Sequence, residues 1–528
     1  MRSASAAGIF ARMRSRVLLA LLVVGAALPL AAQAPQSNLY LPIDSWATPY
    51  VEHLIRAGVL RGLDPLTRPL KRADVARAVA AVDTAELAES VKSSLRLLAW
   101  ELEERPDTVR WKLEANVAAQ GASDASRWTA RPASNRSGLF WQGGLTGSLE
   151  FPHVGVVTSP YFDTRLLRDG QFAGYKARFI AGENAEAYAI GSWKYFEIFF
   201  GREPRNWGPP EAEGILLSTS PYPYDHLMVR LGPRRFRLEL IATQLDNLPM
   251  SQSGLSGKRY LSLHRLVITP SDRLSFSLSE SVLYADTGGP SRSMEPWYLN
   301  VANLWLLTEV NGLGGPTKDL VALDASWLAG RTLRVAGQLF ASDIRVDKAT
   351  PTKPEAPEQL GYTLSATGQA LRGLASWSTF YTRMDNLDYR TPKGTQFQYS
   401  IWGVGLGRDH VDYDQFTARA NALVVPNGLM GAEITYIRQG QGDLRNAYPP
   451  PQHWADSVRF LTGIVERTLR VAAQANWTPM PGINLSTDIG RHFIWNANHV
   501  QGVRGDRWVW RLRAEIRRRI TGAVRWKD

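Results

Sequence analysis

Residues 469–490 read LRVAAQANWTPMPGINLSTDIG and contain two alternating stretches on either side of a proline-rich turn, residues 478–482. From residue 469 to 477, apolar side chains occupy every second position, and arginine, glutamine and asparagine occupy most positions between them. Residues 483–489 repeat this pattern. Because successive side chains of a β-strand point to opposite faces, the stretch predicts a hairpin with one apolar and one polar face.

The same period-two pattern continues along most of the chain. Residues 508–517 and 109–117 alternate in the same way, and weaker copies occur at residues 236–240, 274–278 and 333–339. We therefore predict that residues 107–528 form a single, mainly β domain.

Two architectures contain many such strands: a soluble sandwich or propeller, and a transmembrane β-barrel. In a barrel the apolar face meets lipid, and aromatic residues gather near strand ends. Here Trp477, Trp508 and Trp510 begin or end apolar faces, while the polar faces carry several charges. The stretches approach the roughly 10 residues that a tilted strand needs to cross a bilayer. These features favour a large antiparallel transmembrane barrel, and the length available fits roughly 18 strands.

Residues 1–34 have the pattern of a secretory signal peptide. Arg2, Arg12, Arg14 and Arg16 precede an apolar run, Val17–Leu30, and small residues follow it. The run is shorter than the about 20 residues of a transmembrane helix. We expect a cleaved signal, an exported protein and a location in the outer membrane of a Gram-negative-type bacterium.

Residues 35–106 have helical periodicity instead. The spacing of apolar residues predicts helices over residues 46–60, 72–82 and 84–104, with Asp44 or Ser45 as the first cap and Gly62 as the first stop. A segment of this size is marginally stable alone, so we expect a periplasmic helical subdomain that docks against the barrel.

The composition excludes several classes of function. The chain has no cysteine, which removes disulfide scaffolds, thiol catalysis and Cys-ligated zinc. Its eight histidines form no zinc-enzyme motif, and nucleophile-elbow, phosphate-loop and dinucleotide motifs are lacking. Asp412 and Asp414 are a weak calcium signal beside the simpler interpretation of a solvated loop. We predict no enzyme activity, cofactor or metal. Despite the net charge of +12, an exported barrel does not meet nucleic acid.

Several segments, in order along the chain, resemble the Wzi family of capsule-assembly outer-membrane proteins. They lie in the helical region, around residue 200 and in later strands: residues 41–44 (LPID), 57–59 (AGV), 68–70 (RPL), 74–76 (DVA), 200–209 (FGREPRNWGP), 214–218 (GILLS), 221–223 (PYP), 264–265 (HR), 338–344 (QLFASDI) and 381–387 (YTRMDNL). The resemblance implies a periplasmic helical bundle on an 18-stranded barrel that holds capsular polysaccharide on the cell surface without catalysis.

One segment is a candidate glycan site. Arg202, Arg205, Asn206 and Trp207 offer two guanidinium groups, an amide and an indole. Guanidinium groups bind carboxylates bidentately and an aromatic face suits a sugar ring, so an acidic polysaccharide is a plausible ligand. The alternative is that these residues pack a loop inside the barrel, with the arginines paired to Glu203, Glu211 or Glu213.

Two further sets of charges have open interpretations. Arg511, Arg513, Arg517, Arg518 and Arg519 either attract an acidic polymer or lipopolysaccharide phosphates, or line a solvated wall opposite acidic residues of neighbouring strands. Glu280 falls on the apolar side of its strand, which suggests a bulge or a position beyond the lipid band.

Three functions remain. The leading hypothesis is a monomeric barrel, in contact with outer-membrane lipid and lipopolysaccharide, that binds and assembles capsular or extracellular polysaccharide. The alternative is an outer-membrane porin or solute channel, and the third is an outer-membrane hydrolase.

Overall fold

A computed structural model describes residues 37–103, 108–134, 136–250, 255–288, 291–310, 315–342, 357–371, 373–454 and 460–525. The predicted signal peptide, residues 1–34, lies outside these residues, as does the predicted boundary between the helical subdomain and the barrel. The division of the chain into these domains stays a prediction.

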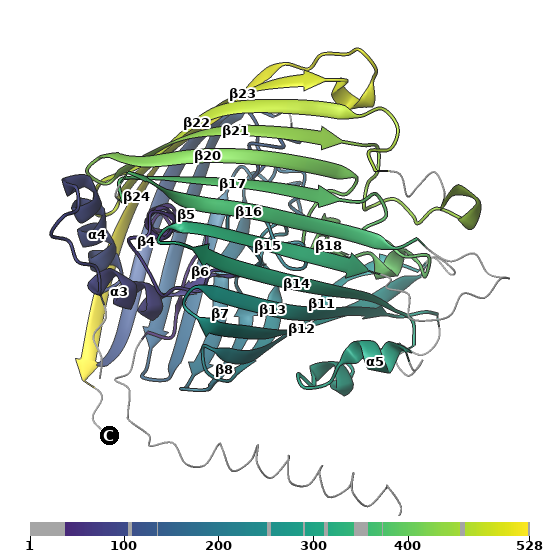
Figure 1. Ribbon diagram of the computed structural model, residues 1–528, viewed down its shortest axis with the longest axis horizontal. Coiled ribbons are helices and arrows are strands. Elements are labelled where there is room, and N and C mark those ends of the chain that lie inside the picture. Colours follow the sequence, from purple (N-terminus) through teal and green to yellow (C-terminus); the bar gives the residue numbers. More distant parts are fainter. Residues whose placement is uncertain are drawn as a thin grey trace, which may run out of the picture. The chain divides into compact units, whose positions relative to one another are not determined.

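The described strands form a closed, antiparallel 18-strand barrel, as the alternation predicted (Figure 1). The barrel closes where β24 pairs with β4, from Arg511 opposite Ala122 to Arg525 opposite Thr108. The strands are β4 (Thr108–Ala122), β5 (Gly138–Glu150), β6 (Val154–Asp163), β7 (Ala181–Ser192), β8 (Phe196–Arg202), β10 (Asp225–Leu231), β11 (Phe236–Pro249), β12 (Ser256–Ser271), β13 (Leu274–Ala285), β14 (Thr317–Ala329), β15 (Leu333–Ser342), β16 (Gln359–Leu371), β17 (Ala375–Met384), β20 (Tyr413–Val425), β21 (Gly428–Gln439), β22 (Glu466–Met480), β23 (Ile483–Trp495) and β24 (Arg507–Arg525).

The apolar face of the strands points outward. Val471, Trp477, Ile489 and Trp508 are all exposed, whereas Arg470, on the polar face, is buried. An exposed apolar band around a closed sheet is the surface that a bilayer covers. The turn after residue 477 is shorter than predicted, because Met480 pairs with Ile483 and only residues 481–482 connect the two strands.

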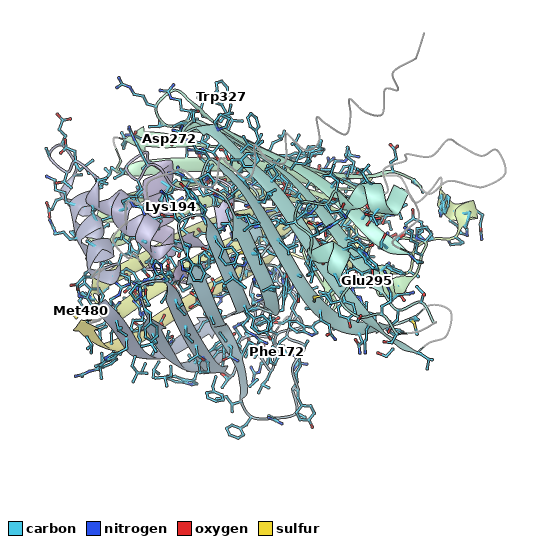
Figure 2. All side chains as sticks on the ribbon, turned by 90° about the horizontal axis from the view of Figure 1, so that it is seen from below. Phe172, Lys194, Asp272, Glu295, Trp327 and Met480 are labelled. Carbon is cyan, nitrogen blue, oxygen red and sulfur yellow. The ribbon has the colours of Figure 1, made fainter. Side chains whose placement is uncertain are left out.

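The two ends of the barrel differ in their connections. At one end, here called the short-turn end, strands are joined by a few residues, as at 151–153, 272–273 and 481–482. At the other, the long-loop end, the connections include residues 203–224, 286–316 and 385–412. Figure 2 shows Lys194, Asp272 and Met480 at the short-turn end, and Phe172 and Glu295 at the opposite end.

Three helices pack at the short-turn end: α2 (Thr48–Arg56), α3 (Arg72–Ala80) and α4 (Glu89–Glu101). Their buried residues, among them Leu54, Val75 and Leu98, share a cluster with Leu423 and Leu429 of the wall. The helices therefore dock against the barrel, as expected.

The helices are shorter than the periodicity predicted. Helix α2 stops before residue 60 because Gly58 adopts the left-handed region at φ +70° and already ends the helix. Among the described residues, every helix is too short or too polar to cross a membrane.

Inside the barrel lies a lumenal plug, defined here as residues 37–71, 203–224 and 385–412. Short strands join its parts: β1 (Tyr40–Leu41) pairs with β3 (Leu70–Lys71), β2 (Thr67–Arg68) with β9 (Asn206–Trp207), and β18 (Ser400–Ile401) with β19 (Val404–Gly405). Its apolar side chains, such as Leu216 and Phe397, form one buried cluster with Leu263, Leu283 and Phe340, which project inward from the wall. The plug thus supplies much of the protein's core.

Candidate functional site

The predicted glycan segment begins at the rim of the long-loop end. Arg202 is the last residue of β8 and lies on the outward face, two positions after the exposed Phe200. Its guanidinium pairs with Glu183 at 2.6 Å and with Asp225 at 2.9 Å. Both partners come from neighbouring strands rather than from the acidic residues named in the sequence alternative.

Arg205 lies on the other side of the wall, in the plug, and is buried. Its Nε donates to His226 Nε2 at 2.7 Å. The guanidinium carbon lies 4.4 Å from the ring centre of Phe199 and 5.0 Å from that of Tyr40. Arg205 is therefore packed between aromatic rings in the lumen.

Asn206 and Trp207 form β9 and are also buried. The Asn206 amide oxygen accepts a hydrogen bond from the Gly214 N–H at 2.7 Å, which closes the loop on itself. The Trp207 indole is 2% exposed, with the Arg265 guanidinium 4.3 Å above its ring. The structure thus brings together three of the four candidate residues in the plug and places Arg202 apart. Their role in glycan binding stays a prediction.

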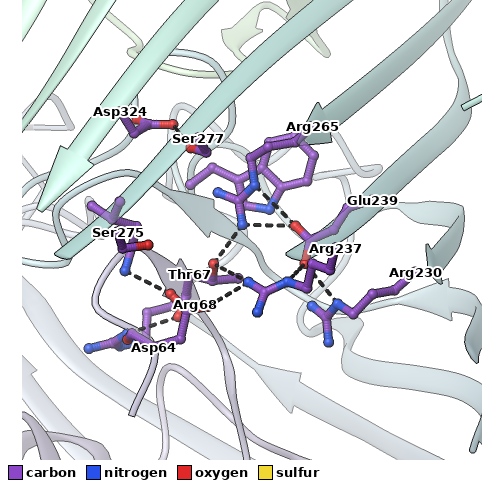
Figure 3. Close-up of polar contacts among 12 residues, drawn as sticks. Asp64, Thr67, Arg68, Arg230, Arg237, Glu239, Arg265, Ser275, Ser277 and Asp324 are labelled. Carbon is purple, nitrogen blue, oxygen red and sulfur yellow. Dashed lines mark hydrogen bonds and ion pairs between the residues drawn. The ribbon is translucent and has the colours of Figure 1, made fainter. Parts of the chain in front are cut away.

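A buried ionic cluster that the sequence did not predict ties the plug to the wall (Figure 3). Glu239 of β11 accepts hydrogen bonds from Arg230 and Arg237 at 2.7 Å each, and from Arg265 Nη2 at 2.8 Å. Arg265 Nη2 also donates to Thr67 Oγ1 at 2.6 Å. We call Glu239 and its three arginines the Glu239 cluster. Its members come from three strands, so only the barrel's register brings them together.

Asp64 of the plug extends this cluster. Its carboxylate lies 2.5 Å from Arg237 Nη2. Burial raises the pKa of Asp64, but attraction by Arg237 and Arg265 outweighs burial and lowers the pKa to about 2. Asp64 is therefore ionised, and it neutralises part of the positive charge left over from three arginines around one glutamate.

Buried cations also hold the plug from the long-loop side. Arg259 of β12 donates to the carbonyls of Gln396 at 2.8 Å and Ser400 at 3.0 Å. Lys318 of β14 donates to the Arg390 carbonyl at 2.9 Å. Carbonyls that would otherwise be unsatisfied in a dry interior thus receive charged donors, which fixes residues 385–412 in the lumen.

The basic end of β24 divides between two faces. Arg517 lies 3.8 Å from Glu114, Arg519 also pairs with Glu114, at 3.3 Å, and Arg513 pairs with Glu515 at 3.2 Å. Arg511 donates to the Arg127 carbonyl at 3.1 Å, whereas Arg518 is exposed on the outward face. The contacts with Glu114 agree with the interpretation that these arginines line the wall opposite acidic residues of a neighbouring strand.

A cavity of about 400 Å³ lies at the long-loop end and is called here the loop-end cavity. Arg445 lines it and pairs with Asp409 at 2.6 Å and Asp443 at 3.1 Å. Arg131 also lines it, with its guanidinium 4.5 Å from the Tyr413 ring centre. The other lining residues are Ala130, Pro132, Ala133, His410, Val411, Ile437, Gln439, Gly440, Gln441, Gly442, Leu444, Glu466, Thr468, His492, Ile494, His499 and Arg507.

The loop-end cavity offers hydrogen-bond donors and acceptors of both charges. Burial, with Arg131 and Arg445 nearby, lowers the pKa of His410 well below its usual range, so this ring is neutral and can accept a hydrogen bond. Such a mixture of guanidinium, carboxylate, amide and imidazole groups suits the hydroxyl-rich surface of a saccharide.

Two more cavities, of about 450 and 580 Å³, lie between the plug and the wall of β4–β7 and β24, and Asp44, Gln142 and Arg513 line both. Another cavity, of about 310 Å³, lies between the plug and the wall near Glu52, Arg68 and Arg419, so the plug leaves several spaces in the lumen.

The next feature is the arrangement of side chains that could bind a metal ion. Among the described residues, no three His, Asp or Glu side chains are grouped so that they could hold a metal ion. Asp412 accepts hydrogen bonds from the N–H groups of Gly442 and Leu461, and Asp414 pairs with Arg438. Both carboxylates are buried by these contacts and not part of a solvated loop, contrary to our expectation.

No protein-family model and no curated protein sequence matches the chain. Among solved structures it resembles Wzi, an outer membrane protein involved in group 1 capsule assembly in Escherichia coli and a carbohydrate-binding β-barrel. The TM-score is 0.59 at 12% identity, covering 90% of this chain and 99% of that chain.

Lower similarity links the chain to two proteins of Pseudomonas aeruginosa. OccD3 (OpdP) has a TM-score of 0.44 at 12% identity, covering 77% of this chain and 91% of that chain. The outer membrane protein OprD has a TM-score of 0.42 at 10% identity, covering 78% and 93%. The chain therefore has the fold of an 18-strand outer-membrane β-barrel like that of Wzi, and the resemblance predicted from the sequence is confirmed at the level of the fold.

Proposed function

We propose that this outer-membrane barrel binds a capsular or extracellular polysaccharide at its long-loop end and retains it on the cell surface without catalysis. In this proposal the short turns and the helices face the periplasm, the long loops face the medium, and the protein acts as a monomer. The likeness to a barrel described as carbohydrate-binding supports the ligand class.

The observation that carries the proposal is the lumenal plug. Its apolar side chains share a buried cluster with the wall, and Arg259, Lys318 and the Glu239 cluster fix it with charged hydrogen bonds. A porin needs a continuous water-filled path, whereas a surface-binding protein needs a rigid platform for its loops. A lumen occupied by a firmly held plug favours the second function, although cavities remain beside the plug.

Two surfaces are candidates for the polysaccharide. The loop-end cavity contributes Arg131 and Arg445, and Arg202 is the most accessible of the four residues predicted from the sequence. At both places guanidinium groups lie beside carboxylates and offer hydrogen bonds to the hydroxyl and carboxylate groups of a glycan, while Arg205, Asn206 and Trp207 would support the loop from inside the lumen.

Binding of purified protein in detergent to fluorescently labelled capsular polysaccharide tests the proposal. We expect Arg445→Ala to weaken binding about tenfold, the effect of losing one charge-assisted hydrogen bond. Arg202→Ala measures the contribution of the rim. Arg504→Ala is the matched control, because Arg504 is exposed at the same end and outside the cavity. Polysaccharide binding that is equally strong in all three variants and in a heat-unfolded sample would refute the proposal.

A solute channel is the second candidate, favoured by the two cavities beside the plug, which charged side chains such as Asp44 and Arg513 line. Planar-bilayer recording separates the two functions. Large, steady unit conductance from the unaltered protein would favour the channel, and the absence of such steps would favour the surface-binding function.

A further inference from the structure

One sector of the outward wall differs from the rest of the apolar band. His264 of β12 and Glu280 of β13 lie directly opposite each other in the sheet. They share their face with Leu278 and Ile268, which are exposed. Pairing is continuous through Glu280, so the bulge suggested by the sequence is absent there. A charged residue on this face would be costly in contact with lipid.

The chain itself covers this pair. Glu280 Oε2 lies 2.8 Å from His264 Nε2 and accepts a hydrogen bond from the Trp305 N–H at 2.9 Å, while Glu280 Oε1 accepts one from the Leu306 N–H. The His264 and Trp305 ring centres are 3.9 Å apart. Glu280 is consequently only 6% exposed, although it points away from the lumen.

The covering segment is called here the wall strap, residues 291–308. It contains a short 3₁₀ helix, Pro296–Leu299, and the first residues of α5 (Trp305–Val310). Figure 1 shows α5 outside the barrel, near the ends of β11–β13. Tyr298 packs on Tyr284 with ring centres 4.7 Å apart. An aromatic cluster therefore holds the strap against the wall.

The outer side of the wall strap is itself apolar. Trp297, Leu304 and Leu307 are 45%, 56% and 56% exposed. The charged side chains of Arg292 and Glu295 pair with each other at 2.6 Å. Below the strap on β13, Phe276 and Leu278 continue the exposed band. The strap thus covers the polar pair of His264 and Glu280. Its outer side presents an apolar surface that is continuous with the lipid-facing band.

We propose that the wall strap lies in the membrane, at the boundary between head groups and acyl chains of the leaflet around the long-loop end, and that lipid covers Trp297, Leu304 and Leu307. Tryptophan favours this interface because its ring is apolar and its N–H is polar. Exposure of the same three residues to water would cost about 25 cal/mol per Å² of apolar surface. The strap therefore belongs to the membrane-facing surface, although its position in the chain is that of a long loop.

The absence of native cysteine allows a direct test, since a single introduced cysteine is labelled uniquely. Leu304→Cys and Leu307→Cys would carry a nitroxide label in phosphatidylcholine liposomes, and collision with oxygen or with a water-soluble nickel chelate would be measured. Leu278→Cys is the lipid-facing control, and Val500→Cys, exposed in the loop of residues 496–506, is the water-facing control.

We expect the ratio of oxygen to nickel accessibility at both strap positions to lie near that of Leu278→Cys and several-fold above that of Val500→Cys. A ratio equal to that of Val500→Cys at both positions would overturn the proposal. Spin–spin broadening between labels at Leu307→Cys would also overturn it, because a second copy of the chain would then cover the strap. Heat-modifiable migration of each variant confirms that the barrel is folded.

Discussion

The Glu239 cluster and the Arg202 rim pairs use the same chemistry in opposite surroundings. Glu239 and Arg265 are about 1% and 0% exposed, whereas Arg202 and Asp225 are 21% and 56% exposed. Water and salt screen the rim charges, but nothing besides the partners compensates the buried ones. The comparison shows that burial, and not residue type, decides what an arginine does here. A buried arginine such as Arg265 holds the plug, whereas Arg202 forms ion pairs at the surface of the barrel.

The largest effect is expected from Glu239→Gln. Three guanidiniums would lose their shared carboxylate in a dry interior, so we expect about 5 kcal/mol less stability, the upper end for breaking a buried ion pair. Urea unfolding in detergent micelles measures the loss. Asp225→Asn, which removes a carboxylate at the rim, is the matched control. An equal loss of unfolding free energy in both variants would show that the Glu239 cluster is no more important for stability than the ion pairs at the rim.

Trp207→Ala tests the contribution of buried contacts in the plug, for comparison with the ion pairs at the rim. Removing a fully buried indole leaves a cavity, at a cost of about 4 kcal/mol. We also expect residues 203–224 to become sensitive to protease, because β9 would lose its packing under Arg265. Limited proteolysis followed by mass spectrometry locates the cuts. Unchanged protection of this loop would show that the indole does not hold it.

The third prediction concerns pH at the docking surface of the helices. Burial, with Arg56 nearby, lowers the pKa of His53 in α2 to about 4, and His53 Nδ1 lies 2.9 Å from Ser376 Oγ. Protonation therefore favours the unfolded state, where the pKa is about 6.5. Stability is complete above that value and falls by about 3 kcal/mol as the pH drops from about 6.5 to about 4.

Urea midpoints at pH 7 and pH 5 test this expectation. His53→Gln keeps a hydrogen-bonding side chain and removes the titration, so its midpoint should change less between the two pH values. An identical pH response in both proteins would assign the effect to other groups.

The smallest effect is expected from Arg202→Ala. The Arg202 pairs are partly exposed to solvent, and such pairs contribute less than about 1 kcal/mol, so the urea midpoint should move less than in the other variants. The residual effect should shrink further at high salt. A loss comparable to that of Glu239→Gln would mean that the rim is as dry as the lumen.

The sequence predicted the wall far better than it predicted the plug. Alternation marks each strand locally, so the outward exposure of Val471 and Trp508 followed from neighbouring residues alone. The plug depends on contacts between distant segments, such as Thr67 with Trp207, which no periodicity reveals. For the same reason the sequence does not predict the Glu239 cluster, whose members meet only through the register of β10–β12. The four candidate residues looked like one site because they are adjacent in sequence, yet the wall of the barrel separates Arg202 from the other three.

The pairing of β2 with β9 also constrains how the barrel is made. Residues 67–68 come before every strand of the wall, and they end up enclosed by it. The wall is completed only when β24, the last strand, joins β4. An early segment must therefore be inside before the final seam is sealed, or it must pass through an opening that the plug would later fill. The pairing of β2 with β9 therefore links the placement of the amino-terminal segment to the closure of the barrel by its last strand.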